Sequence, residues 1–271
     1  MKRLLIVVFL VLISVSSYAQ ITKASKFKRP VFVIDVSGGY SLPLHDLTGS
    51  NVGEYYSFTD YAVNNGINSS IKGKYSVYTA PLTQLRLTAA IGYNHFWASD
   101  DFAYNVGVFP AGWPSHSYTP PGTTVPGESY IRLNVPEAAL GMEFAFWIDP
   151  QLRNNMSIGV EALMSMITGR VFNTKYGQPE TFNTLRDNVR IGFAVNYSYA
   201  TRITENFGFN LGIKYSLRNL IGKDVQQDGT DGYMYLNDAA GADINPYLTN
   251  SRTIGDLSVY GGVSFFIGTK K

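Results

Sequence analysis

The 271-residue sequence contains no cysteine. Disulfide bonds, thiolate nucleophiles, cysteine-ligated zinc sites and a lipid-modified N-terminal cysteine are therefore excluded. Charged residues make up 15% of the chain, well below the roughly 25% of soluble domains. The formal net charge of +2 is too small to indicate nucleic-acid binding. Three histidines lie far apart in the sequence, so no metal-ligand spacing links them, and we predict neither a metal nor a cofactor.

Long apolar runs are almost absent, and the one that exists lies at the N-terminus. Lys2 and Arg3 precede the apolar stretch Leu4–Ile13, and the small-x-small site Ser17–Ala19 follows. This order is typical of a secretory signal peptide, so we predict a signal peptide over residues 1–19 and a short periplasmic tail over residues 20–29. No later run reaches the roughly 18 apolar residues of a membrane-spanning helix, so membrane residence would have to come from strands.

The most regular pattern in the chain is the stretch Val189–Arg218. Apolar and aromatic residues alternate with small or polar ones, pause at Thr201–Asn206, and then alternate again. Because side chains alternate between the two faces of a strand, this stretch predicts a β-hairpin with one apolar and one polar face. Each arm has about the 9–11 residues that a tilted strand needs to cross a bilayer.

The composition of the polar face indicates which face meets lipid. In a soluble barrel this face would be rich in lysine and glutamate, but here it is mostly glycine, alanine, serine and asparagine. Small side chains with a few paired charges fit the narrow lumen of a membrane barrel. We therefore expect the apolar face, including Phe193, Leu211 and Val263, to point outward into hydrocarbon.

The same alternation recurs along residues 30–271 and predicts an all-β, transmembrane, antiparallel up-and-down β-barrel of about eight strands. Short connections alternate with long ones, which is typical of outer-membrane barrels with short periplasmic turns and long extracellular loops. In the fourth strand the apolar residues change from odd-numbered to even-numbered positions at Pro136. This change predicts a β-bulge there. The predicted strands are Val31–Leu44, Ile67–Thr79, Gln84–Trp97, Tyr130–Ile148, Asn155–Phe172, the two arms of Val189–Arg218, and Asp256–Gly268.

Three segments carry a family resemblance: the signal peptide ending at Ala19–Gln20, the first-strand sequence VSGGYSLPLHDL (Val36–Leu47) and the closing sequence GGVSFFIG (Gly261–Gly268). With the strand pattern, they resemble the small OmpA/OmpX-like outer-membrane β-barrels. The resemblance implies a monomer in the outer membrane of a Gram-negative cell, surrounded by outer-membrane lipid and inserted by the barrel-assembly machinery.

The first candidate site consists of charged residues at strand positions whose side chains are predicted to face the lumen. Unpaired charges are costly in a confined lumen, so we expect these residues to form an ion-pair network. Such a network fills the barrel, or alternatively gates a polar path for small solutes. Acid–base catalysis by Glu137 and Glu143 is disfavoured, because neighbouring cations would lower their pKa values. The predicted network comprises Asp35, Lys72, Lys74, Arg86, Arg132, Glu137, Glu143, Glu161, Arg190, Lys214 and Arg218.

Aromatic residues in the predicted loop Ala98–Ser129 form the second candidate site. They either bind a surface glycan or protein, or pack on one another to order the loop. The loop aromatics are Phe102, Tyr104, Phe109, Trp113 and Tyr118.

The pair His95 and Ser99 lacks a recognisable catalytic motif, so we predict no enzyme and no catalytic residue. The predicted function is a structural or surface-interaction role through the extracellular loops. The alternatives are a narrow channel for small solutes and a subunit of an outer-membrane secretion or assembly complex.

Overall fold

The computed structural model describes residues 27–48, 63–97, 127–175, 181–223 and 251–270. The predicted signal peptide and the five loop aromatics lie outside these ranges. In the described part of the chain, no helix is long and apolar enough to span a membrane.

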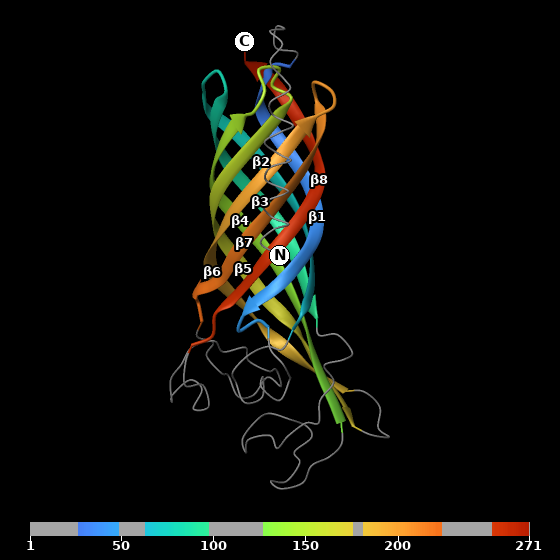
Figure 1. The fold of residues 1–271 in the computed structure, drawn as a ribbon. Helices are drawn as coiled ribbons and strands as arrows, with labels where there is room; N and C mark the ends of the chain where they lie inside the picture. Colours follow the sequence, from blue (N-terminus) through green and yellow to red (C-terminus); the bar gives the residue numbers. More distant parts are fainter. Residues whose placement is uncertain (1–26, 49–62, 98–126, 176–180, 224–250, 271) are drawn as a thin grey trace, which may run out of the picture.

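Eight antiparallel strands form one closed barrel, in which each strand pairs with its neighbours in the sequence and β1 pairs with β8 (Figure 1). The predicted fold class is therefore confirmed. The strands are β1 (Arg29–His45), β2 (Asn65–Thr79), β3 (Thr83–Trp97), β4 (Gly127–Trp147), β5 (Asn154–Lys175), β6 (Thr181–Arg202), β7 (Phe207–Ile221) and β8 (Ile254–Lys270).

Three short connections link β2 to β3, β4 to β5, and β6 to β7, as predicted. The Ala80 amide donates to the Thr83 carbonyl (2.9 Å) in the first turn, and the Ile203 amide donates to Phe207 (2.9 Å) in the third. In the second, the Asp149 carboxylate accepts hydrogen bonds from the amides of Arg153 and Asn154. Figure 1 places all three turns at the end of the barrel that carries the C-terminus, which is the expected periplasmic end.

The predicted strands leave residues 173–188 as a connection between the fifth and sixth strands, and that prediction is wrong. β5 continues to Lys175 and β6 begins at Thr181, so most of this segment is paired strand. In Figure 1, β4, β5 and β6 extend past the other strands at the end opposite the short turns. A strand beyond the bilayer does not need an apolar outer face, so the alternation that reveals membrane strands is missing there.

The predicted bulge at Pro136 is also wrong. β4 keeps an unbroken register with β3 and β5 through this position. The apolar residues before Pro136 therefore face the lumen, on the same side of β4 as Glu137 and Glu143. Ile131, Leu133 and Val135 are all buried, so they form an apolar layer in the extracellular half of the lumen.

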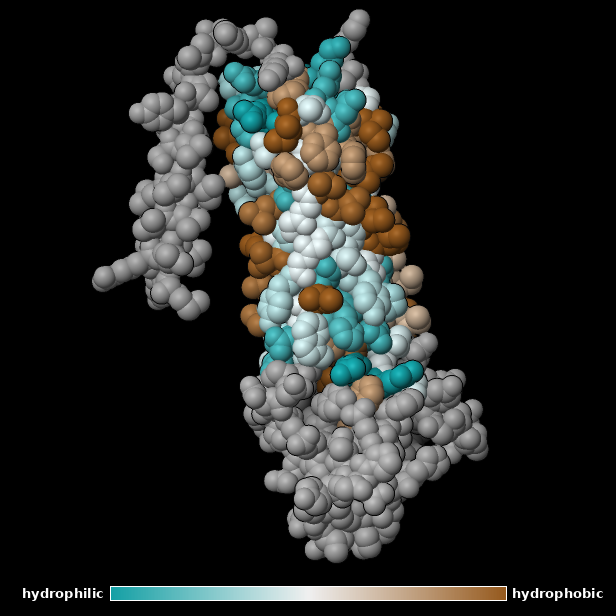
Figure 2. All heavy atoms as spheres, turned by 90° about the vertical axis from the view of Figure 1, so that its right-hand side faces the viewer, coloured by the Kyte–Doolittle hydropathy of each residue, from teal (hydrophilic) through white to brown (hydrophobic). Residues whose placement is uncertain are grey.

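The outer wall of the barrel is apolar and the interior holds charges, the reverse of a soluble protein. Leu140 is 68% exposed and Leu211 is 58% exposed, whereas Arg86 and Arg218 are fully buried. Figure 2 shows hydrophobic side chains gathered over the middle of one face of the wall, with hydrophilic ones at the C-terminal end. Phe193 and Val263 share the outer parity with Ile191 and Phe265, which are exposed. The predicted outward orientation of the apolar face is therefore confirmed.

Glycine makes room for a large side chain at one point of the inner face. Gly212 on β7 lies opposite Tyr260 on β8. A Cβ atom added to Gly212 would come within 2.4 Å of the Tyr260 hydroxyl. The tyrosine ring therefore occupies the space that any other residue at position 212 would fill.

Candidate functional site: the lumen network

A cluster of four charges lies in the periplasmic half of the lumen. Lys74 Nζ on β2 contacts Glu143 Oε2 (2.8 Å) on β4 and Asp35 Oδ2 (3.0 Å) on β1. Arg86 on β3 donates from Nη1 to Glu143 Oε1 (3.0 Å) and from Nη2 to the Gln84 side-chain oxygen (2.7 Å). These contacts join four consecutive strands through their side chains.

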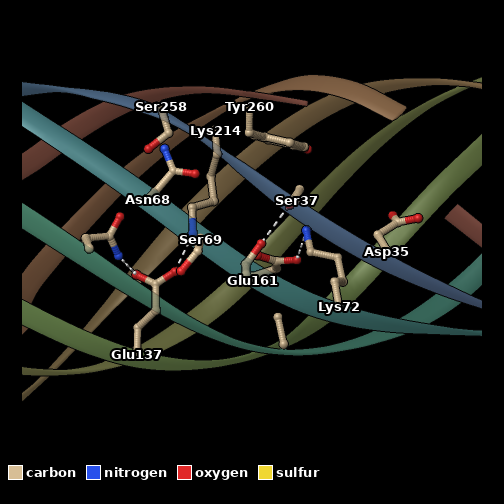
Figure 3. A pocket seen from close by; sticks show the side chains of 13 residues that line it. Asp35, Ser37, Asn68, Ser69, Lys72, Glu137, Glu161, Lys214, Ser258 and Tyr260 are labelled. Carbon is tan, nitrogen blue, oxygen red and sulfur yellow. Dashed lines mark hydrogen bonds and ion pairs between the residues drawn. The ribbon is translucent and has the colours of Figure 1, made fainter. Parts of the chain in front are cut away.

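A single ion pair spans the middle of the lumen. Lys72 Nζ on β2 lies 2.7 Å from Glu161 Oε1 on β5, across the barrel interior. Figure 3 shows the two side chains pointing toward each other, with Glu137 and Lys214 paired nearby. Apolar residues pack beside this ion pair. Ala139, Leu163 and Ala194 form a buried cluster with Ala90 packed against it.

A second cluster of four charges lies in the extracellular half. Glu137 on β4 accepts from Lys214 Nζ (2.5 Å), from Arg218 Nη1, and from the Asn94 amide (3.0 Å). Arg218 Nε donates to Asp256 Oδ1 on β8 (2.7 Å). Asp256 was not among the predicted network residues. The alternation along β8 could have revealed it, because Asp256 faces the same side of the strand as Ser258 and Ser264.

The charges in these ion pairs balance. Five cations meet five carboxylates, and every one of them lies on the inner face of a strand. A buried ion pair stabilises a fold only weakly, but removing one partner leaves a costly uncompensated charge. The ten residues are Asp35, Lys72, Lys74, Arg86, Glu137, Glu143, Glu161, Lys214, Arg218 and Asp256.

Two of the predicted network residues differ from this picture. Arg190 is fully buried on the inner face of β6 and interacts elsewhere within the chain. Arg132 was predicted to face the lumen, and that prediction is wrong. Arg132 is exposed on the outer face of β4, and its guanidinium carbon lies 5.0 Å from the centre of the Phe172 ring. The error follows from the wrong bulge at Pro136, because an unbroken register places every even-numbered residue of β4 outside.

Several apolar side chains pack at the extracellular end of the lumen, next to the buried Asn219 and Arg252. Leu47, Val63, Phe96 and Ile254 are buried there beside the apolar layer of β4. The Arg218 guanidinium carbon lies 5.9 Å from the centre of the Phe96 ring, so the network meets the apolar layer directly. Phe96 in turn covers Gly66 on β2, where an added Cβ would come within 2.5 Å of the ring.

A lysine follows β7 at this end, just beyond the last strand residue. Lys223 Nζ donates to the Arg252 carbonyl (2.8 Å). Burial lowers the pKa of Lys223, and the Asp46 carboxylate opposes that shift.

An arginine surrounded by aromatic rings closes the periplasmic end. The Arg202 guanidinium carbon lies 4.9 Å from the ring centre of Phe27, 5.9 Å from Trp147 and 4.7 Å from Phe266. Arg202 also donates to the carbonyls of Lys28 (2.6 Å) and Glu205. The last residues of the predicted periplasmic tail therefore pack against the barrel. The Phe27 amide donates to the Gln151 carbonyl (3.3 Å) in the turn between β4 and β5. Trp147 is buried in this group and packs with Phe27 and Leu152.

A small polar cavity lies between the two charge clusters. Its volume is about 30 Å³, above the roughly 10–15 Å³ that a cavity needs to hold a water molecule. Asp35, Lys72, Glu137 and Tyr260 line it together with serine and asparagine side chains (Figure 3).

The described histidines are engaged in hydrogen bonds near the extracellular end. His45 Nε2 bonds the Tyr215 hydroxyl (2.7 Å), and His95 Nδ1 bonds the Asn134 side-chain oxygen (2.8 Å). Within the described ranges, no group of three histidine, aspartate or glutamate side chains is arranged to hold a metal ion.

No protein-family model and no curated protein matches the chain. Solved structures do match. Neisserial surface protein A is 12% identical, with 87% of this chain and 97% of that one covered and a TM-score of 0.38. Ail of Yersinia pestis, solved in complex with the heparin analogue sucrose octasulfate, is 11% identical, with coverages of 86% and 99% and a TM-score of 0.35. The outer membrane protease OmpT from Escherichia coli is 8% identical, with coverages of 92% and 99% and a TM-score of 0.38.

These identities are too low to carry a function from one protein to another. The closed eight-stranded sheet and its apolar outer wall stand independently of them. That sheet and that wall give the chain the fold of a transmembrane β-barrel.

Proposed function

We propose that this protein is a non-conducting outer-membrane barrel that serves as a rigid scaffold for its extracellular segments. One observation carries the proposal: ion pairs, aromatic rings and apolar side chains occupy the described part of the lumen, and the polar cavity among them has a volume of only about 30 Å³. Arg202 and its aromatic rings fill the periplasmic end, the two charge clusters fill the middle, and Phe96 with Leu133 fills the extracellular end.

Rigidity supports a scaffold role. Side-chain ion pairs link strands across the lumen, so the barrel resists deformation in addition to its backbone pairing. A binding surface on long loops gains from a rigid support, because less freedom is then lost on binding. The proposed binding segment includes residues 98–126, which contain the five loop aromatics. The ligand class that suits aromatic side chains in such a segment is a surface glycan or a protein.

Replacing residues 98–126 by a four-residue turn tests the display role. The variant is expected to fold and insert normally, because the charge network and apolar layers stay intact. Whole cells with the variant should lose adhesion to a glycan array or to host-cell protein, relative to cells with the unaltered protein. Equal adhesion by both kinds of cell would contradict display through this segment. A variant in which residues 224–250 are replaced by the same turn is the matched comparison, since it also shortens one extracellular connection but keeps residues 98–126.

A narrow channel is the second candidate. The small polar cavity between Lys72, Glu137 and Glu161 favours it, because polar groups surround an open space inside the membrane region. Planar-bilayer recordings separate the two candidates. A scaffold shows no conductance steps above the bare bilayer. Reproducible steps whose size changes in the Glu143→Ala variant would replace the scaffold by the channel.

We further propose that the protein is not an enzyme. Support comes from the two described histidines, which bond a tyrosine and an asparagine rather than a nucleophile or a carboxylate. Incubating the purified protein with a mixed peptide library and with phospholipid vesicles tests this proposal. Product formation that disappears in the His95→Ala variant would overturn it.

A further inference from the structure

A short basic segment, Phe27–Arg29, crosses the periplasmic end of the barrel and is held there by hydrogen bonds to backbone carbonyls and from a buried arginine. The amide of its first residue donates to the Gln151 carbonyl (3.3 Å), and the carbonyl of its second accepts from Arg202 Nη1 (2.6 Å). The Arg29 guanidinium donates from Nε (3.2 Å) and Nη2 (3.0 Å) to the Pro81 carbonyl. These contacts reach the turn between β4 and β5, the end of β6, and the turn between β2 and β3. The segment therefore has a fixed place beside the short turns.

The charge that this end presents to its surroundings is positive. Three basic residues form what we call the basic rim: Lys28, Arg29 and Arg153. The first and third are exposed, the second is partly exposed, and within the described ranges none of them forms an ion pair. Arg202 joins them, because its amide donates to the Arg153 carbonyl (2.8 Å) while its side chain bonds the Lys28 carbonyl. The carboxylates of this end are engaged: Asp149 accepts two backbone amides, and Glu205 lies beside Arg202.

Apolar side chains beside the basic rim place it at the membrane surface. Leu82 follows Pro81 in the first turn, Ile203 begins the third turn, and both side chains are exposed. Tyr78, near the end of β2, is 62% exposed. Apolar side chains are stabilised by contact with lipid rather than water, and tyrosine rings concentrate at the depth of the headgroups. Figure 2 shows the hydrophilic side chains of this end directly adjoining the hydrophobic wall. Long basic side chains in these turns therefore reach lipid headgroups.

An anionic polymer in the aqueous periplasm is the other partner that positive charge would suit. Such a polymer would meet Lys28 and Arg153 from below, but it would leave Leu82 and Ile203 facing water. A phospholipid accounts for both features, because its headgroup meets the cations while its upper chain segments meet the apolar turn residues. The position of the basic rim therefore favours lipid.

From these observations we propose that the basic rim binds anionic phospholipids in the leaflet at the periplasmic end of the barrel. Basic side chains next to a membrane surface attract anionic headgroups, and their N–H groups donate charged hydrogen bonds to phosphate oxygens. The contacts of Phe27–Arg29 with Gln151, Arg202 and Pro81 hold two of the three cations in place. Less freedom is then lost when a lipid binds.

Local enrichment of lipid tests the proposal. The chain has no native cysteine, so Leu82→Cys accepts a single fluorophore beside the basic rim. The labelled full-length protein is refolded into phosphatidylcholine vesicles that contain a small fraction of either phosphatidylglycerol or phosphatidylcholine with a nitroxide near the top of one acyl chain. Quenching by the nitroxide measures how often each lipid lies next to the fluorophore. We expect about fivefold or greater preference for phosphatidylglycerol, the effect of at least one basic side chain near an anionic headgroup. High salt should reduce this preference.

Substitutions in the basic rim separate charge from structure. Lys28→Gln/Arg29→Gln/Arg153→Gln should abolish most of the preference, with folding checked by circular dichroism. Arg29→Lys/Arg153→Lys changes the guanidinium contacts but keeps the charge, so it should keep the preference.

A fluorophore at the other end of the barrel is the positional control. Leu42→Cys lies on the outer face near the extracellular end of β1 and should show no preference between the two lipids. An undiminished preference in the glutamine variant overturns the proposal, and so does an equal preference at the Leu42→Cys position. Equal quenching by both lipids beside the unaltered rim, with sedimentation of the protein on isolated peptidoglycan, also overturns it and assigns the rim to the polymer.

Discussion

Lys74 Nζ lies 2.8 Å from Glu143 Oε2 and ties β2 to β4 across the intervening strand. Neither residue is exposed, and Arg86 contacts the other oxygen of the same carboxylate. The carboxylate is therefore shared between two cations that have no access to bulk water.

Replacing Glu143 by glutamine should destabilise the barrel strongly. The change keeps the side-chain shape but leaves Lys74 and Arg86 without their shared carboxylate. Removing one partner of a buried pair costs about 3–5 kcal/mol. Urea titration of the vesicle-inserted protein, followed by tryptophan fluorescence, measures the free energy of unfolding. Glu205→Gln in the exposed periplasmic turn is the control, with a change within about 0.5 kcal/mol. Similar values for the two variants would mean that the network contributes little.

Gly212→Ala should disturb the inner wall, because the new methyl group occupies the place of the Tyr260 ring. Forcing an enclosed side chain out of its position costs about 1–3 kcal/mol. Gly261→Ala is a matched control on the neighbouring strand, since its Cβ would meet no atom nearer than 3.7 Å. The same urea titration compares the two variants. An unchanged free energy of unfolding in Gly212→Ala would show that Tyr260 moves aside freely.

Arg202→Gln should release the segment Phe27–Arg29 from the periplasmic end. The variant loses the contacts to three rings and the charged hydrogen bonds to two carbonyls. Charged hydrogen bonds are worth about 1.5–3 kcal/mol, so exchange of the Phe27 amide hydrogen should accelerate roughly tenfold or more. Hydrogen-exchange mass spectrometry measures this rate. Arg153→Gln, in the adjacent turn, should leave it unchanged. Equal protection in both variants would show that Arg202 does not hold the segment.

Placing an arginine on the outer wall should cost free energy in proportion to depth. Leu140→Arg lies in the middle of the apolar belt, and such changes cost about 2–4 kcal/mol at the bilayer midplane. Ile67→Arg lies at the extracellular end of β2, where the cost falls to about 0–1 kcal/mol. Unfolding in vesicles of one lipid composition compares them. Equal costs for the two variants would place the membrane elsewhere on the barrel.

The sequence predicted the fold well because the membrane enforces strict alternation wherever a strand crosses it. All eight strands and all three short turns were found from this pattern. The errors lie where that constraint is absent. Residues 181–188 pair beyond the membrane region, so their polar sequence looked like a loop. Near the extracellular end of β4, the lumen contains Ile131 and Leu133, so hydrophobicity no longer marks the outer face.

The site was harder to predict than the fold. Whether a residue joins the network depends both on the face of the strand that it occupies and on its level along the barrel axis. Parity alone placed Lys74, Glu143 and Glu161 in the lumen, where the structure pairs them. The same rule misplaced Arg132, because one wrong bulge reversed the face. Asp256 was missed because it stands at the start of its strand, where a carboxylate usually ends a loop. Arg202 was missed because its partners are rings and carbonyls, which leave no charge pattern in the sequence.

The most direct test of the whole account uses the absence of native cysteine. Leu140→Cys, Val160→Cys and Leu211→Cys each accept one nitroxide label, and electron paramagnetic resonance in vesicles measures contact of the label with oxygen and with a water-soluble nickel complex. An outward-facing apolar wall predicts high oxygen contact and low nickel contact at all three positions. Labels that are immobile and reached by neither reagent would mean that these residues pack in the centre of the molecule, and the membrane barrel would be contradicted.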